Sequence, residues 1–259
     1  MEDENLYDKI KELFGNIPDN FNILEEVIDI DLQLEYFEFS RKHRKDFVTE
    51  EIMQTKNDLF NENISEEDKK KMLVQLASIE DVEAYRVIEK FIGDKDNPLY
   101  YWAVLAYQES RMLLESKLLE ENQVFISTGL GGKENKLRYF VVLIAKSDEP
   151  FSKFQEEIIS KEFKYVLKEN EAEVEEVELY GNFITLVTLI PLEVSLKNIF
   201  KDAIKECNQY GDFLSSHFIV TNVKKLSNEE IIEFLKDRKD KNKYSASKKE
   251  EEKNKNDSN

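Results

Sequence analysis

The chain contains a single cysteine, Cys207, among 259 residues, and therefore no pair that could form an internal disulfide. It also lacks a continuous apolar run of about eighteen residues, the minimum expected of a membrane-spanning helix. Its beginning, MEDENLYDKIKELF, is acidic, whereas a secretory signal starts with basic residues followed by an apolar run. These absences predict a soluble protein of the reducing cytoplasm with no membrane contact.

Residues that commonly perform catalysis are also scarce. Two histidines are present, His43 and His217, and the motifs HExxH, CxxC, GxSxG and GxGxxG do not occur. His217 is expected to be an ordinary strand residue rather than a metal ligand or a general base. Acidic pairs such as Glu173 and Glu175 carry little information, because acids occur throughout the chain. We therefore predict no catalytic residues, no metal site and no cofactor, and a protein that is not an enzyme.

Basic residues are outnumbered, since 37 lysines and arginines stand against 55 acids and the formal net charge is −18. Because duplex binding depends on a broad basic surface, this balance predicts no DNA partner. The hydrophobic fraction of 41% is sufficient to bury a core of ordinary size. The chain is therefore expected to be globular, with an extensively hydrated acidic surface.

The densest positive charge in the part of the chain expected to fold lies in the run SRKHRK at residues 40–45. Its four cations are Arg41, Lys42, Arg44 and Lys45. One interpretation is a hydrated helix end, where cations oppose the negative C-terminal end of the helix dipole. The alternative is a docking patch for an acidic protein or for RNA phosphates, including those of the ribosome.

Glycine is rare, and three of the seven glycines lie in the stretch STGLGGKENK at residues 127–136. A nucleotide-binding P-loop needs the pattern GxxxxGK, a hydroxyl residue after the lysine and a following helix, whereas this stretch has Ser127 and Thr128 where that pattern would begin, Glu134 after the lysine and a following apolar run. We interpret Gly129, Gly131 and Gly132 as positive-φ residues of a long hairpin connection, with Lys133 in its exposed tip. The alternative is a loop whose backbone amides also contact a ligand or a partner.

Helical periodicity dominates residues 1–119, beginning with an amphipathic segment around Leu6 and Ile10. Helix starts are indicated by Ser65, by Asp81 and by Pro98. An aromatic cluster follows the last of these starts, formed by Tyr100, Tyr101 and Trp102. Most aromatics at helical spacing belong to a core, and the alternative is an exposed anchor for a partner.

Residues 65–119 resemble HEAT-like helical repeats. The resemblance lies in LASIEDVEAYRVIEKFI, in the acid-rich turn GDKDNP and in WAVLAYQESRMLL, with Leu76-Ala77 recurring as Leu105-Ala106 about thirty residues later. It implies a protein-binding surface on this part of the chain. A generic helical bundle is the alternative.

After residue 121 the apolar period changes to that of strands. Strands are predicted at 123–129, 137–146, 172–180, 182–190 and 214–223, and helices at 151–169, 195–208 and 227–237. From the second strand onward the order βαββαβ is that of a ferredoxin-like plait. The first plait strand normally has neighbours on both sides, which leaves its expected hairpin partner at 123–129 without a place.

These patterns predict an α+β protein with a helical module at 1–119, an α+β sheet domain at 123–236 and a disordered, charged tail at 237–259. The leading functional hypothesis is a cytoplasmic, non-catalytic protein-interaction adaptor with a protein partner. A second hypothesis is a sheet domain that senses a small ligand. A third is a hydrolase or transferase with an unrecognised motif.

Overall fold

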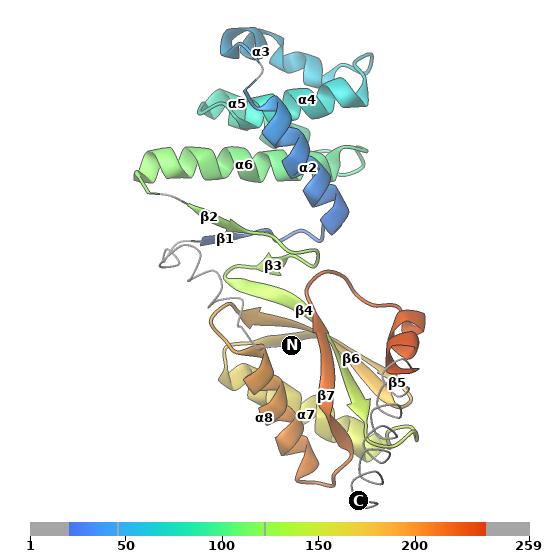
Figure 1. Cartoon of the computed structure of the whole chain (residues 1–259). Helices are drawn as coiled ribbons and strands as arrows, with labels where there is room; N and C mark the ends of the chain where they lie inside the picture. The colour runs from blue at the N-terminus through green and yellow to red at the C-terminus, as the bar shows by residue number, and fades with distance from the viewer. Residues whose placement is uncertain (1–20, 46, 122, 237–259) are drawn as a thin grey trace, which may run out of the picture. The chain divides into compact units, whose positions relative to one another are not determined.

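The computed structural model describes residues 21–45, 47–121 and 123–236 (Figure 1). The chain divides into two compact units, Met1–Lys224 and Lys225–Asn259. In its described part the second unit contains a helix at residues 228–236, which begins after a reciprocal pair of hydrogen bonds between Ser227 and Glu230. The amphipathic segment predicted around Leu6 and the tail predicted at 237–259 lie outside the described residues.

The helical part of the first unit is built from consecutive helices joined by short turns. They are α2 (Ile30–His43), α3 (Thr49–Thr55), the 3₁₀ helix η1 (Lys56–Phe60), α4 (Glu66–Ala77), α5 (Val82–Phe91) and α6 (Tyr100–Leu119). Side chains cap several of these helices, which satisfies backbone N–H groups that have no partner within the helix. Ser65 accepts from the N–H of Asp68 at 3.1 Å, and Asp81 accepts from the N–H of Glu83 at 2.7 Å. Both predicted capping residues are confirmed.

The core of the helical part surrounds Trp102, which is 1% exposed. Its indole ring makes edge contacts with Tyr36 and Phe39 at centroid distances of 5.2 and 5.3 Å. Its Nε1–H donates to the carbonyl of Lys70 at 3.3 Å, so the polar end of the ring is satisfied. Leucines and isoleucines of α4, α5 and α6 complete this cluster.

The sheet part contains β4 (Lys136–Ala145), β5 (Glu173–Tyr180), β6 (Phe183–Pro191) and β7 (Leu214–Thr221), in the spatial order β5–β6–β4–β7. All of these pairs are antiparallel, and the short strand β3 (Gly132–Lys133) pairs with the beginning of β4. Every residue of β6 is buried, and this strand lies between β4 and β5.

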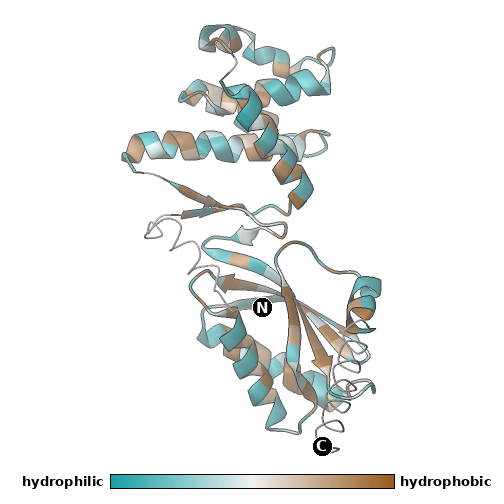
Figure 2. Cartoon of the chain, viewed as in Figure 1, coloured by the Kyte–Doolittle hydropathy of each residue, from teal (hydrophilic) through white to brown (hydrophobic). Residues whose placement is uncertain are grey.

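Two helices, α7 (Lys153–Glu169) and α8 (Leu196–Asn208), pack on one face of the sheet. A capping box between Ser152 and Gln155 starts α7, and Ser195 caps α8. Their buried positions repeat at helical spacing, as in Ile159, Phe163 and Val166 of α7. Figure 2 shows brown central strands, whereas much of the visible surface of α7 and α8 is teal.

The prediction of a mixed α+β chain is confirmed, but the predicted partner of the 123–129 strand is wrong. The strand that forms there, β2 (Val124–Ile126), pairs in parallel with β1 (Phe21–Ile23) and lies outside the main sheet. Local periodicity carries no information about a partner so distant in sequence. The HEAT-like repeat and the plait assignment stay predictions. Among the described residues, no helix combines the length and apolar character that a bilayer span requires.

Candidate functional site

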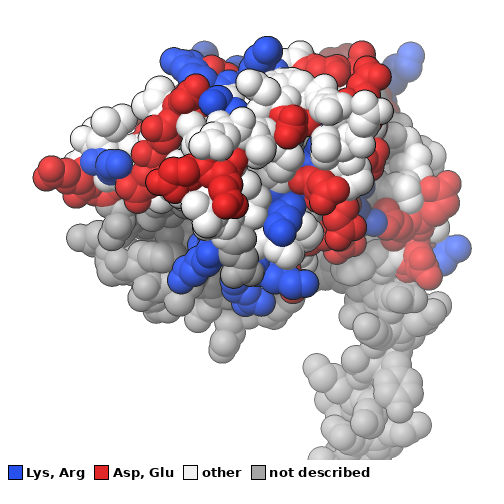
Figure 3. Space-filling view, turned by 90° about the horizontal axis from the view of Figure 1, so that it is seen from above, with Lys and Arg blue, Asp and Glu red and all other residues white. Residues whose placement is uncertain are grey.

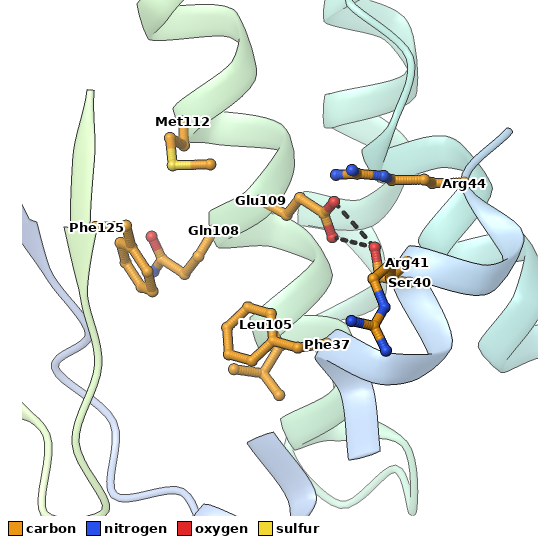
Figure 4. A pocket seen from close by; sticks show the side chains of 9 residues that line it. All are labelled: Phe37, Ser40, Arg41, Arg44, Leu105, Gln108, Glu109, Met112 and Phe125. Atoms are coloured by element: carbon orange, nitrogen blue, oxygen red, sulfur yellow. Dashed lines mark hydrogen bonds between the residues drawn. The ribbon is translucent and has the colours of Figure 1, made fainter. Parts of the chain in front are cut away.

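A cavity of about 250 Å³ opens between α2, α6 and β2 (Figure 4). Nine side chains line it: Phe37, Ser40, Arg41, Arg44, Leu105, Gln108, Glu109, Met112 and Phe125. Helix α2 supplies the first three and its C-cap residue Arg44 the fourth, α6 supplies the next four, and β2 the last. We call it the α2–α6–β2 cavity.

The apolar wall of the cavity contains two phenylalanines, one on each side. Phe37 of α2 is 45% exposed. Phe125 of β2 lies across the cavity from it, and Leu105 and Met112 of α6 complete the apolar surface. An exposed aromatic beside a cavity is a typical contact surface for a flat, weakly polar ligand.

The cationic side of the cavity carries Arg41 and Arg44, at the end of α2. Both side chains are exposed, and neither forms an ion pair with a residue in the described part of the chain. With respect to the described residues, these two guanidinium groups have ten N–H donors that could bind an anion.

A carboxylate, that of Glu109, lines the same cavity and is held by two hydroxyls of α2. Tyr36 Oη donates to Glu109 Oε2 at 2.6 Å, and Ser40 Oγ lies 3.0 Å from both carboxylate oxygens. Burial, together with the neighbouring Glu109 charge, raises the pKa of Tyr36 well above its usual value, so the phenol keeps its proton and remains a donor. The carboxylate is therefore fixed in orientation.

The amide of Gln108 is the remaining polar group of the wall. Within the described residues it makes no hydrogen bond, so both its N–H₂ and its carbonyl are available. Figure 4 shows the Gln108 side chain directed toward Phe125. The cavity thus combines an apolar surface, a free amide, an oriented carboxylate and two free cations.

Lysines lie on the outer sides of α7 and α8, among exposed acids such as Glu157, Glu169 and Asp202. Five lysines there are exposed and form no ion pair with a described residue: Lys153, Lys164, Lys168, Lys201 and Lys205. Phe154 and Tyr165, on the same side of α7, are 64% and 62% exposed. We call this set the lysine surface. Figure 3, which views the chain from above, shows a different face on which acidic and basic side chains are interspersed.

The predicted docking patch is only partly at the cavity. Arg41 and Arg44 line it, Arg41 and Lys42 also line a second depression with Glu35 and Glu38, and Lys45 lines neither. All four cations are exposed at the C-terminal end of α2. Of the four cations in the run at residues 40–45, two therefore line the α2–α6–β2 cavity and two lie outside it.

Residues 128–132 of the glycine stretch are buried and lead into the β3–β4 hairpin. Gly131 alone among its three glycines has a positive φ, of 64°, so positive φ was the wrong reason for the other two. A Cβ at Gly129 would lie 1.8 Å from the carbonyl oxygen of Val223, so close packing requires glycine there. Lys133 is exposed beside the turn between β3 and β4, as the hairpin interpretation predicts.

The predicted aromatic cluster and the scarce reactive residues lie elsewhere. Trp102 is in the core, as the core interpretation predicts, whereas Tyr101 is 48% exposed. His217 is an exposed residue of β7, and Cys207 is buried in α8. Across the described residues, no cluster of three or more His, Cys, Asp or Glu has the geometry to hold a metal ion.

The sequence did not identify Phe37, Gln108, Met112 and Phe125 as site residues. They come from three segments that the fold brings together, and each fits its local apolar or helical pattern. The lysine surface had a readable signal, since its α7 lysines recur at helical spacing opposite the buried stripe.

Comparison with known proteins gives matches to solved structures only. No protein-family model and no curated protein matches the chain. One similar structure is a putative transposase from Deinococcus radiodurans R1, at 12% identity and a TM-score of 0.36, with 41% of this chain and 93% of that chain covered. Another is a REP-associated tyrosine transposase bound to a REP hairpin, at 7% identity and a TM-score of 0.31, with 36% and 59% covered.

These matches contradict four of the predictions made from the sequence. We predicted a non-catalytic adaptor that binds proteins, has no enzymatic activity and has no DNA partner. All four predictions conflict with similar structures that are described as transposases. The exclusion of a DNA partner rested on the net charge of −18, which does not say where individual cations lie: Arg41 and Arg44 line one cavity and form no ion pair with a described residue. At these TM-scores the similarity assigns no activity to this chain.

Proposed function

We propose that the chain binds single-stranded nucleic acid, with one unstacked base in the α2–α6–β2 cavity and its phosphate beside Arg41 and Arg44. The observation that carries this proposal is that one cavity brings together aromatic side chains and two guanidinium groups that form no ion pair with a described residue. Bases stack on aromatic side chains with about 1–3 kcal/mol each, and guanidinium groups bind phosphate oxygens through two parallel hydrogen bonds.

The size of the cavity favours a single nucleotide over a larger ligand. Its volume of about 250 Å³ lies below the range typical of pockets for drug-sized molecules. A purine or pyrimidine fits such a space, and the exposed position of Phe37 and of both arginines leaves the sugar and the phosphate outside it.

The acidic surface is compatible with this mode of binding. A duplex requires many cations along a broad face, which a chain with a net charge of −18 lacks. A single strand held at one base needs cations at one or two phosphates only, and Arg41 and Arg44 meet that need.

Fluorescence anisotropy with a labelled twelve-nucleotide strand of mixed sequence tests the proposal. Replacing both Arg41 and Arg44 by alanine is expected to weaken binding by at least about tenfold, since hydrogen bonds to charged groups contribute about 1.5–3 kcal/mol each. The matched control replaces Lys42 and Lys45, which changes the net charge equally outside the cavity, and is expected to retain most of the affinity.

Mononucleotides provide a second test. Free nucleoside 5′-monophosphates distinguish a nucleotide site from a strand-binding site, because a strand gains contacts beyond one nucleotide. The proposal is wrong if the wild-type chain binds neither strands nor mononucleotides, or if the arginine pair and the lysine pair weaken binding equally.

A further inference from the structure

We propose that the α2–α6–β2 cavity selects guanine over the other bases, through hydrogen bonds from the guanine edge to the carboxylate of Glu109. This inference rests on the proposed nucleotide binding and adds the identity of the base. The carboxylate lines the cavity, and two hydroxyls of α2 fix its position.

The carboxylate of Glu109 retains acceptor capacity after its internal bonds are counted. Two oxygens offer about four lone-pair positions in total. Tyr36 and Ser40 each have one hydroxyl proton, so together they occupy two of these positions. About two positions remain for a ligand, and they belong to a group whose orientation is already set.

The bases differ in what they present to such a carboxylate. Guanine places two adjacent donors, N1–H and N2–H, on its pairing edge and can bond both carboxylate oxygens in parallel. Adenine and cytosine place an acceptor nitrogen next to their amino group, and thymine and uracil flank one N–H with two carbonyl oxygens. Each of these four bases would direct a lone pair at a negative charge, which is unfavourable in a partly enclosed site.

The amide of Gln108 adds a second discriminating group. The residue precedes Glu109 on α6, lines the same cavity and has no hydrogen bond within the described residues. Its N–H₂ can donate to O6 of guanine, whereas adenine has a donor amino group at that position. Gln108 is directed toward Phe125 and Glu109 toward Ser40 (Figure 4), so the amide and the carboxylate approach a bound base from different sides.

Isothermal titration of the wild-type chain with GMP, IMP, AMP, CMP and UMP tests this inference. GMP is expected to bind at least about tenfold more tightly than AMP, CMP or UMP, because a site built around hydrogen bonds rejects bases that leave its polar groups unpaired. IMP lacks only the 2-amino group of GMP, so it is expected to bind about tenfold more weakly than GMP.

Two variants separate the role of Glu109 from general damage to the fold. Glu109→Gln replaces an acceptor-only group by an amide and is expected to abolish the preference for GMP over AMP. Lys42→Ala removes a neighbouring charge that does not line the cavity, and is expected to keep the preference. Circular dichroism checks that both variants remain folded.

The possible failures are distinct. Equal affinity of the wild-type chain for all five nucleotides, or an unchanged preference in a folded Glu109→Gln variant, overturns guanine selection and leaves nucleotide binding intact. Absence of binding to every nucleotide and to strands overturns the proposed function, and guanine selection with it.

Discussion

The buried glycines at 129–132 illustrate how single residues are fixed by neighbours that are distant in sequence. Gly129 packs against the carbonyl of Val223, and Gly131 combines a positive φ with a Cβ position 2.5 Å from the carbonyl oxygen of Glu25. Neither contact is encoded in the stretch itself. The sequence therefore indicated that glycine is needed here, but not which force requires it at each position.

Replacing Gly129 by alanine is expected to lower the free energy of unfolding by about 1–3 kcal/mol or more, because the new methyl group overlaps backbone atoms that cannot move aside cheaply. Gly181→Ala is the matched control, since its φ is 61° but no atom lies within 4 Å of the added Cβ. Only backbone strain of about 1–2 kcal/mol is expected there. Lys133→Ala is expected to change stability by less than about 0.5 kcal/mol.

Chemical denaturation of the three variants gives these free energies directly. A Gly129→Ala chain as stable as the wild type would show that the segment has a different packing from the one described. A large loss for Lys133→Ala would show that the lysine has a structural partner.

Two buried acidic groups make the fold sensitive to alkaline pH. Burial raises the pKa of the Cys207 thiol from 9.0 to about 12, and burial raises the pKa of Tyr139 from 10.0 to about 12. Between pH 9 and 12 the unfolded chain releases these protons first, so it binds fewer protons than the folded chain and stability falls as pH rises.

Tyr139→Phe removes one of these titrations and keeps the ring. Its free energy of unfolding is therefore expected to decrease less steeply than that of the wild type as pH rises from 10 to 12. Denaturation at several pH values gives both slopes. Parallel slopes would mean that the Tyr139 hydroxyl is hydrated in the folded protein.

At the scale of elements, the sequence predicted those whose burial pattern is local. The helix predicted at 151–169 is Lys153–Glu169, and the strand predicted at 182–190 is Phe183–Pro191. The helix shows apolar positions at helical period, whereas the strand is a nearly continuous apolar run. The pairing of β1 with β2 was not predictable, because three-residue strands carry almost no periodic signal and their partners are distant in sequence.

The candidate site was less predictable than the elements for a related reason. Arg41 and Arg44 were found because clustered charge is visible in one segment. Phe125 and Gln108 were not, because a strand phenylalanine and a helix glutamine are ordinary residues until another segment is placed across from them. Charge density is a local property, whereas a cavity wall is a product of packing.

The lysine surface on α7 and α8 makes a prediction that belongs to these two helices. If it contacts strand phosphates, replacing Lys164, Lys168 and Lys201 by glutamine lowers the slope of log affinity against log salt concentration by about 2, at about 0.7 per phosphate contact of a single strand. Anisotropy titrations over a range of sodium chloride concentrations measure the slope.

The control for the lysine surface replaces Lys69, Lys71 and Lys95, which lie in the helical part on or near α4 and α5. This change removes the same charge and is expected to leave the slope within about 0.5 of the wild-type value. An equal reduction in both triple variants would show that net charge, rather than the lysine surface, sets the salt dependence.

At the scale of the whole molecule, the excess of acids sets how the fold responds to salt. The ion pairs described, such as Lys70 with Glu35 and Arg111 with Glu115, have at least one partly exposed partner and contribute little to stability. Repulsion among the uncompensated carboxylates of a chain with a net charge of −18 acts over longer distances. Added salt therefore weakens the repulsion among carboxylates more than it weakens the attraction within the ion pairs.

We expect the melting temperature to rise when sodium chloride is increased from about 20 to about 300 mM, which shortens the Debye length from about 20 Å to about 6 Å. A gain of about 1 kcal/mol corresponds to about 2–4 °C for a chain of this size. Nucleotide affinity is expected to fall over the same range, because the contact between arginine and phosphate is attractive and exposed. Differential scanning fluorimetry and titration in the same buffers give both quantities. A melting temperature that falls with salt would mean that the surface ion pairs outweigh the net repulsion. An affinity that rises with salt would mean that overall repulsion, rather than Arg41 and Arg44, governs the approach of the ligand.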